Sequence, residues 1–284
     1  MEPRNKLQAF GAPFDISASS CSDYKPLTFR WTVEDCPIKV FIDGAIVPGI
    51  NYIKKSGEKK VAWICESRSI FHAMHVPLMS WEKNLDLIAN SYDLIFVSDK
   101  QWCQKHQNIK YCPAGSNYPW IRIPKELPTK DKLVSMVASP KQFTEGHRFR
   151  HGIAEKYKDK LDLFGGACGS QRFGILRSPW DHKEMTTSPY MFSIVIENDS
   201  YETYFTEKIT DCFAVGTIPV YWGSPDIDSY FDSNGIIKLT DNFDISCLTK
   251  DLYLSKIEAI LHNHQTIQDM EMADDTLYRL IHEN

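Results

Sequence analysis

The chain has 284 residues, of which 43% are hydrophobic and 24% charged, with 32 Lys and Arg against 37 Asp and Glu for a formal charge of −5. This composition excludes a disordered tail, a collagen-like rod and a small disulfide-rich protein. The net negative charge argues against a protein that coats nucleic acid through its phosphates, and the length suits two domains at about 150 residues each.

The first half of the chain alternates apolar, β-prone runs with helical spacing. Residues 38–42, 60–65, 93–97 and 109–112 are predicted strands, and residues 81–90 have the spacing of a helix. Strands that alternate with helices are typical of a parallel sheet with crossover helices. We therefore expect an α/β domain in this half.

Residues 123–130 contain two prolines and are predicted to be a linker. After them the pattern restarts, with a second set of predicted elements: strands 133–138, 161–164, 192–196 and 218–222, helices 147–158 and 206–215, and a largely helical end at 248–284. The expected domains are therefore residues 1–125 and 126–284, with the last helix a candidate to pack back on the first domain. Ligands usually bind in the cleft between two such domains.

The amino terminus has no apolar stretch long enough for a signal peptide, and no run approaches the roughly 18–20 apolar residues that span a bilayer. The eight cysteines are scattered through a chain too long to need disulfides, and we interpret them as reduced thiols. Cys103, His106 and Cys112 lack the second ligand pair of a structural zinc site. These features predict a cytoplasmic protein without a metal or other cofactor.

Residues 190–230 carry most of the chemical information. The predicted strand 192–196 ends in Glu197 and Asn198, a loop with Tyr204 follows, and a helix begins near Glu207 and Lys208. Such β-α-β units bind ligands outside the carboxyl ends of strands, beside helix amino termini. We therefore expect a ligand site here.

Lys208 has an unusual position for a cation. In the first turn of a helix a positive charge opposes the helix dipole. A bound anion such as a nucleotide diphosphate would compensate for this cost, and so would a nearby carboxylate or exposure to water. Both explanations remain open at this point.

The run E-N-x₅-Y-x-T-E-K, followed by A-x-G-T-I-P-V-Y-W-G-S-P, resembles the donor-binding motif of the α1,3-fucosyltransferases of glycosyltransferase family ten. The resemblance is dense over residues 190–230 and scattered elsewhere. It implies a GT-B fold, in which two Rossmann-like domains with parallel sheets face each other across a cleft and the carboxy-terminal domain binds GDP-fucose.

The resemblance also implies roles for individual residues. Asn198, Tyr204, Glu207 and Lys208 would bind the donor, with Lys208 at the phosphates and Glu207 at sugar or ribose hydroxyls. The family has a further diphosphate-binding arginine on the first helix of this domain. Arg148 and Arg150 are both candidates, and Arg150 is preferred because apolar Ile153 follows it, as in the family pattern.

The family's general base is a glutamate that follows a strand of the first domain. Glu66 occupies the corresponding place after the predicted strand 60–65, although Arg68 stands where the family usually has proline. The resemblance thus makes Glu66 the candidate base, whereas by itself it would read as a carboxylate in a surface turn.

The function expected from these features is inverting, metal-independent transfer of L-fucose from GDP-fucose to a glycan hydroxyl. The alternatives are a GT-B transferase with another nucleotide sugar and an inactive module that binds nucleotide sugars or glycans. Asp226 and Asp228 form a D-x-D triplet that could chelate a metal, and the glycine-rich loop 165–169 could hold a phosphate or be a plain turn.

Overall fold

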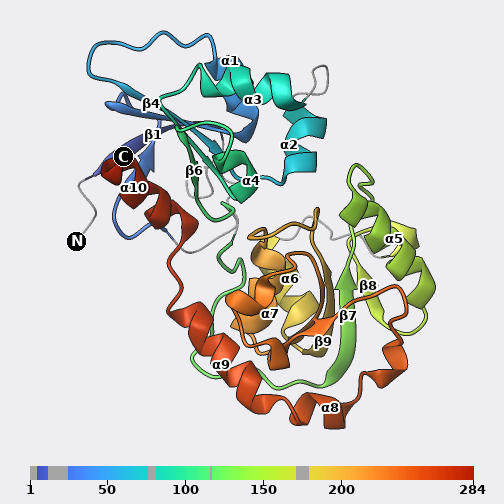
Figure 1. Cartoon of the computed structure of the whole chain (residues 1–284). Helices are drawn as coiled ribbons and strands as arrows, with labels where there is room; N and C mark the ends of the chain where they lie inside the picture. The colour runs from blue at the N-terminus through green and yellow to red at the C-terminus, as the bar shows by residue number, and fades with distance from the viewer. Residues whose placement is uncertain (1–4, 12–24, 76–80, 116, 171–178) are drawn as a thin grey trace. The chain divides into compact units, whose positions relative to one another are not determined.

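The computed structural model describes residues 5–11, 25–75, 81–115, 117–170 and 179–284, and it divides the chain into two α/β units (Figure 1). The first unit comprises Met1–Asn117 together with Glu271–Asn284, and the second comprises Tyr118–Met270. The division thus lies earlier than the expected one after residue 125, and the carboxyl-terminal segment returns to the first unit.

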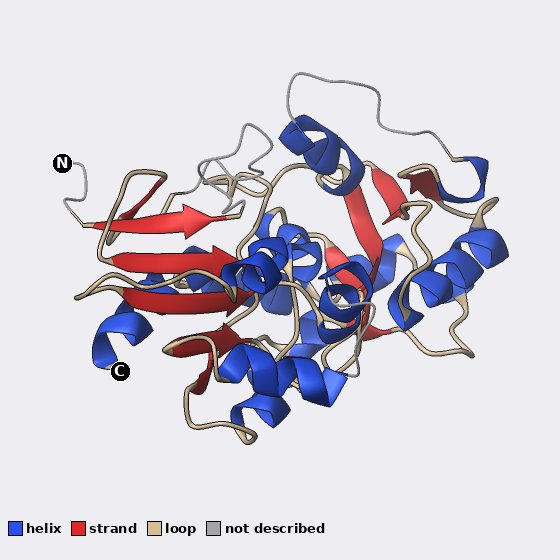
Figure 2. Cartoon of the chain, turned by 90° about the horizontal axis from the view of Figure 1, so that it is seen from above, coloured by secondary structure: helices blue, strands red, loops and turns tan. Residues whose placement is uncertain are grey.

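The first unit contains a six-stranded sheet whose strand pairs are all parallel, as the arrows in Figure 2 illustrate. Its order is β2-β1-β3-β4-β5-β6. The strands are β1 (Lys6–Phe10), β2 (Arg30–Thr32), β3 (Ile38–Ile42), β4 (Lys59–Ile64), β5 (Leu94–Val97) and β6 (Ile109–Tyr111). The four predicted strands are confirmed, whereas β1 and β2 escaped prediction because they are short and only alternate side chains are buried.

Helices cover both faces of this sheet. One face packs against short helices from the first half of the chain: α1 (Ile46–Gly49), α2 (Arg68–His75), α3 (Trp81–Ala89) and α4 (Lys100–Cys103). The other face packs against α10 (Ala273–Glu283), drawn in red in Figure 1. Leu277 and Ile281 of α10 share a core with Trp31 and Trp63, so the end of the chain completes the first unit.

The second unit contains a five-stranded sheet of order β11-β10-β9-β7-β8, again with parallel pairs only. Its strands are β7 (Lys132–Val137), β8 (Asp162–Phe164), β9 (Tyr190–Ile196), β10 (Ile218–Trp222) and β11 (Ile237–Lys238). All seven residues of central β9 are buried, which explains its continuous apolar sequence. The strand order reverses between β7 and β9, the place where such sheets usually bind ligands.

The described part of the second unit also contains five α-helices. They are α5 (Glu145–Tyr157), α6 (Pro179–Thr187), α7 (Glu207–Ala214), α8 (Lys250–Leu254) and α9 (Ile257–Gln268). The helices predicted at 147–158 and 206–215 are confirmed as α5 and α7, and the helical end at 248–284 is divided into α8, α9 and α10. Within the described residues, no helix combines the length and apolar character needed to cross a membrane.

Candidate functional site

A cavity of about 140 Å³ lies in the second unit beside the carboxyl-terminal halves of β7 and β9, where the strand order reverses. Helices α5, α6 and α7 close it with charged side chains. Its charged lining residues are Arg150, Lys183, Glu207, Lys208 and Asp211. Three of the five predicted donor-binding residues thus border one cavity.

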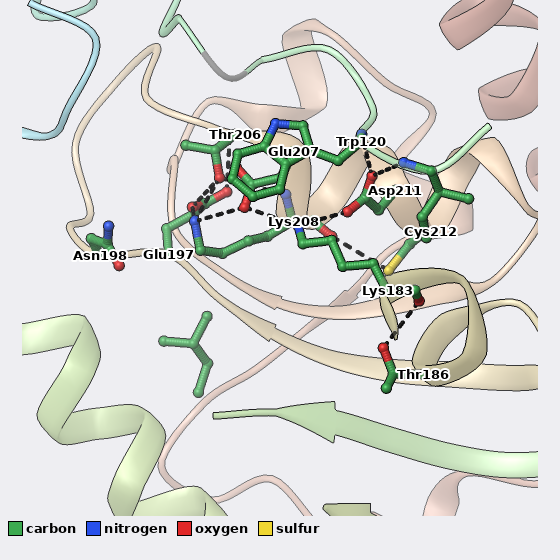
Figure 3. Close-up of polar contacts among 12 residues, drawn as sticks. Trp120, Lys183, Thr186, Glu197, Asn198, Thr206, Glu207, Lys208, Asp211 and Cys212 are labelled. Atoms are coloured by element: carbon green, nitrogen blue, oxygen red, sulfur yellow. Dashed lines mark hydrogen bonds and ion pairs between the residues drawn. The ribbon is translucent and has the colours of Figure 1, made fainter. Parts of the chain in front are cut away.

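Glu197, which directly follows β9, binds the residue at the beginning of α7 through hydrogen bonds. Its carboxylate is fully buried and accepts hydrogen bonds from the Thr206 backbone N–H at 2.9 Å and the Thr206 hydroxyl at 2.7 Å. Lys208 Nζ lies 3.2 Å from Glu197 Oε2 and donates to Thr206 Oγ1 at 2.8 Å (Figure 3). Lys208 therefore pairs with a carboxylate, the second of the two explanations for its position, while its side chain stays 25% exposed and borders the cavity.

Glu207 belongs to a buried ion network rather than projecting freely. Lys183 Nζ, from α6, lies 3.0 Å from Glu207 Oε1 and 2.8 Å from Asp211 Oδ2, and Lys208 Nζ lies 3.6 Å from Glu207 Oε1 (Figure 3). Burial opposes ionisation of Glu207, but the two lysines outweigh it and lower its pKa to about 2. Glu207 is therefore a permanent carboxylate at any working pH.

Asp211 connects this network to the segment that leaves the first unit. Its Oδ1 accepts the backbone N–H groups of Trp120 at 2.6 Å and Ile121 at 3.0 Å, and Lys183 Nζ lies 4.1 Å from the centre of the Trp120 ring. Burial raises the pKa of Asp211, and the charge of Glu207 adds to this effect, while Lys183 opposes it. Of the two carboxylates that share Lys183, Asp211 is the more easily protonated.

Arg150 reaches the end of β9 from α5. Its Nη2 donates to the Ile196 carbonyl and lies 3.4 Å from Asn198 Oδ1. This close approach needs a glycine on α5, because a Cβ at Gly146 would lie 1.9 Å from the Glu197 carbonyl oxygen. Arg148 instead lies exposed and donates to loop carbonyls of residues 142 and 143, so only Arg150 reaches the predicted site.

The pKa of His147 reflects first its burial and then the positive charge around it. His147 follows Gly146 in the first turn of α5, and burial, followed by the charge of Arg150 and that of Lys141 and Lys208, lowers its pKa to about 4. The imidazole is therefore neutral at physiological pH.

Asn198 and Tyr204 lie near this cavity but do not line it. Asn198 is half-buried and contacts Arg150, whereas Tyr204 is 1% exposed and stacks on Tyr201 with ring centres 4.9 Å apart. The preceding residue, Thr203, has a φ of +70°, and its N–H donates to Asp226 Oδ1 at 2.8 Å. Asp226 therefore holds the tyrosine loop.

Glu66 lies in the first unit, directly after β4 and Cys65. The backbone N–H groups of Cys65 and Glu66 donate to Asp43 Oδ1 at 2.9 and 3.2 Å. Asp43 follows β3 with a φ of +40°, and burial together with the charge of Glu66 raises its pKa to about 7. Two carboxylates thus lie at the carboxyl ends of neighbouring strands.

Arg68, the departure from the family pattern, has its own buried partner. Its Nε donates at 2.8 Å to Asp99 Oδ2, which follows β5 and caps α4. The ion pair connects the ends of β4 and β5, and α2 begins at Arg68. Arg68 thus stabilises the turn that carries Glu66 in place of the usual proline.

Lys183 and Asp43 were not predicted as site residues, and Glu197 was noted only as a polar residue at the end of a predicted strand and the first residue of the motif. Glu197 and Asp43 each follow a strand, so polarity at a strand's carboxyl end was an available signal for both. Lys183 lies on a polar helix, and its sequence context resembles that of any exposed lysine.

The residues considered for metal binding have other partners. Asp228 pairs with Lys238 at 3.2 Å, His106 with Asp86 at 2.8 Å, and the Cys112 thiol lies 3.7 Å from the Ala273 carbonyl. Throughout the described part of the chain, no three His, Cys, Asp or Glu side chains gather as metal ligands would. The loop 165–169 contains a short 3₁₀ turn and does not line the cavity.

Comparison with known proteins agrees with the motif. Residues 127–265 match the family model for the C-terminal part of glycosyltransferase family 10 (fucosyltransferase). An α-(1,3)-fucosyltransferase, FucT, from Helicobacter pylori is 38% identical over 65 residues, which are 22% of this chain and 14% of that protein. This chain therefore matches only a small part of that relative's length.

Solved structures resemble the chain over much more of its length. A crystal structure of an α1,3-fucosyltransferase with GDP has a TM-score of 0.52 at 16% identity and covers 96% of this chain and 93% of its own. The crystal structure of TarM has a TM-score of 0.53 at 11% identity, and the match covers 86% of this chain and 54% of the TarM chain. The chain has the GT-B fold of these structures, and its residues 127–265, just under half of the chain, match the family model of glycosyltransferase family 10, the fucosyltransferases.

Proposed function

We propose that this protein is an inverting glycosyltransferase that transfers L-fucose from GDP-fucose to a hydroxyl group of a glycan, like the α1,3-fucosyltransferases. The observation that carries the proposal is the cavity beside β7 and β9, which Arg150 and Lys208 both line and which lies inside the segment that matches the family. The solved fucosyltransferase with GDP, which shares this fold, supports a guanine nucleotide as the donor's leaving group.

The donor diphosphate binds between Lys208 and Arg150 in this proposal. Both cations lie at the carboxyl ends of strands, and Lys208 sits in the first turn of α7, where backbone N–H groups add to the attraction. Negative charge grows on the diphosphate as its bond to the sugar breaks, so these cations stabilise the transition state more than the bound donor. Asn198 and Tyr204 border the nucleotide from the adjoining loop.

Glu207 acts as a fixed hydrogen-bond acceptor for sugar or ribose hydroxyls. Its carboxylate stays ionised because Lys183 and Lys208 lower its pKa to about 2, more than outweighing burial. A base this weak removes a hydroxyl proton poorly at neutral pH. This argues for a separate general base.

Glu66 is the proposed general base. It accepts the proton of the acceptor hydroxyl while that oxygen attacks the anomeric carbon from the face opposite GDP. A new C–O bond forms, the bond between the sugar and the diphosphate breaks, and GDP leaves with the bonding electron pair, so the configuration inverts. The lysine and arginine side chains supply the charge neutralisation that a metal provides elsewhere, and the reaction is proposed to need no metal.

Nucleotide binding and turnover test the proposal together. A ligand at about 100 times its Kd stabilises a protein by about 2.7 kcal/mol, so GDP and GDP-fucose should raise the melting temperature more than UDP- or CMP-sugars. Release of GDP from GDP-fucose with a glycan acceptor should follow. Larger shifts with UDP-sugars would indicate a different transferase, and binding without turnover against a broad acceptor panel would indicate an inactive module.

A further inference from the structure

Lys183 borders the cavity but lies outside the family motif. It comes from α6, and its Nζ lies within 3.0 Å of carboxylate oxygens on both Glu207 and Asp211. Its side chain is 23% exposed and borders the cavity with Lys208 and Arg150. Lys183 therefore faces the proposed diphosphate site without being part of the motif.

Once Glu197 is counted, which pairs with Lys208 without lining the cavity, the charges in and beside the cavity balance only when Lys183 is included. Three cations and three carboxylates form the described network, and the carboxylates outnumber the cations if Lys183 is removed. These groups are Arg150, Lys183 and Lys208 on one side and Glu197, Glu207 and Asp211 on the other. An excess carboxylate in a partly buried cavity repels an anion such as a diphosphate.

Lys183 is also the shared partner of two carboxylates on one helix. Glu207 and Asp211 are spaced i, i+4 on α7, where two like charges destabilise each other. Lys183 bridges both of them, while Lys208 lies 3.2 Å from the fully buried Glu197 and 3.6 Å from Glu207. Lys183 thereby reduces the negative charge that Lys208 alone would have to balance.

We infer that Lys183 is an electrostatic positioning residue of the donor site, which neutralises Glu207 and Asp211 so that a diphosphate can bind to Lys208 and Arg150. This inference rests on the proposed function, since it concerns the same cavity and the same ligand class. It adds a residue, on a different helix, whose charge sets the affinity for the diphosphate.

The test is a charge series measured with GDP by calorimetry at several pH values. K183M should weaken GDP binding by roughly ten- to a hundredfold at pH 8, as expected for one charge near the ligand at an effective dielectric constant of about 20. The double variant K183M/D211N restores the charge balance and should recover most of the affinity. The carboxamide that D211N introduces can still accept hydrogen bonds from the backbone N–H groups of Trp120 and Ile121 through its oxygen, so these backbone contacts remain.

The pH dependence separates charge from packing. Without Lys183, Asp211 is the carboxylate that takes up a proton, since burial and the charge of Glu207 both raise its pKa. The loss of affinity in K183M should therefore be smaller at low pH, where Asp211 is protonated, than at high pH, and it should be independent of pH in K183M/D211N. Other charged or titratable groups facing the network are common to all variants: Glu197, Arg150, Lys208, Cys212 and, beside Cys212, Lys130.

Two further variants guard against a folding defect. D211N alone keeps Lys183 and adds one net positive charge, so GDP should bind at least as tightly as in the wild type. K158M removes an exposed lysine of the same unit that pairs with Glu155, and its GDP affinity should be unchanged. Melting temperature and circular dichroism report on the fold of each variant.

The outcomes distinguish this inference from the proposed function. If the wild type binds GDP but K183M/D211N does not recover the affinity lost in K183M, the role of Lys183 is overturned and the proposed function is not. Weaker GDP binding by D211N than by the wild type would have the same meaning. The wild type could instead fail to bind GDP but bind UDP or inorganic pyrophosphate, with the variants ranked by affinity in the order predicted for GDP. In that case the donor assignment fails and the role of Lys183 stands. Absence of binding to all three ligands would overturn both.

Discussion

In the second unit Glu207 lies 3.0 Å from Lys183 and 3.6 Å from Lys208, whereas in the first unit Asp43 lies beside another carboxylate, Glu66. The consequence is opposite pKa shifts. Burial is overcome at Glu207, and its pKa falls to about 2, but at Asp43 burial and the charge of Glu66 act together and raise the pKa to about 7. The same functional group is a fixed anion in one unit and a group that titrates near neutrality in the other.

This difference separates two kinds of chemistry. Proton transfer is efficient when a group titrates near the working pH, and a neighbouring carboxylate is one way to bring this about. Leaving-group stabilisation needs fixed cations and permanently ionised counter-charges instead. The carboxylate pair after β3 and β4 suits the first role, and the ion network around α7 suits the second.

The largest expected effect comes from Glu66→Gln, which tests the first half of this comparison. Gln is nearly isosteric but cannot accept a proton at neutral pH, so kcat should fall by about 10²–10⁴-fold while GDP affinity stays nearly unchanged. Steady-state kinetics and calorimetry measure the two quantities. Glu207→Gln is the matched comparison, and it should keep the acid limb of the kcat pH profile because Glu207 is ionised throughout. Near wild-type turnover of Glu66→Gln would refute the base assignment.

Lys208→Ala tests the second half of this comparison, the ion network around α7. It removes a charge that meets the diphosphate both in the bound donor and in the transition state, so GDP affinity and kcat should both decrease, each by roughly ten- to a hundredfold. The removal of the exposed Lys158 provides a control for the loss of one positive charge. A Lys208→Ala enzyme that changes only kcat would argue that another group binds the phosphates.

Asp43→Asn tests the raised pKa of Asp43 through the pH dependence of the protein's thermal stability. The pKa of Asp43 is raised from its ordinary 3.8 to about 7, so the unfolded chain releases the proton first and stability falls as pH rises from 4 to 7. Asn removes this penalty and tolerates the positive φ, so at pH 8 the melting temperature should rise by about a few degrees, with little change at pH 4. Equal shifts at both pH values would contradict the raised pKa.

The smallest expected effect is that of a chelator. Because Lys208 and Arg150 are proposed to neutralise the diphosphate, turnover in excess EDTA should equal that of the untreated enzyme. A loss of turnover that manganese restores would show that the cation network is insufficient by itself. Asp226→Asn and Asp228→Asn would then be the variants to compare, each against its present partners, Thr203 and Lys238.

Much of the second unit could be predicted from local sequence. The continuous apolar run of β9, the amphipathic spacing of α7 and the glycine that ends this helix each depend on neighbouring residues only. The motif from Asn198 to Lys208 likewise lies within one β-α-β unit, so chain connectivity keeps its residues near one another, although only Glu207 and Lys208 of the predicted four line the cavity. The preference for Arg150 over Arg148 depended instead on the resemblance, because Ile153 follows Arg150 as in the family pattern.

What the sequence by itself determined is therefore the strands from β3 to β10, the helices α3, α5 and α7, the doubled α/β pattern and the family motif. The tertiary structure alone decided which charges meet: Lys208 with buried Glu197, Lys183 with Glu207 and Asp211, and Asp43 with the backbone of Glu66. It also decided that α10 completes the first unit, which the sequence had offered only as a candidate arrangement of the last helix. The physical reason is that hydrophobic periodicity is a local property of the chain, whereas an ion pair or a raised pKa depends on groups that only folding brings within a few ångströms.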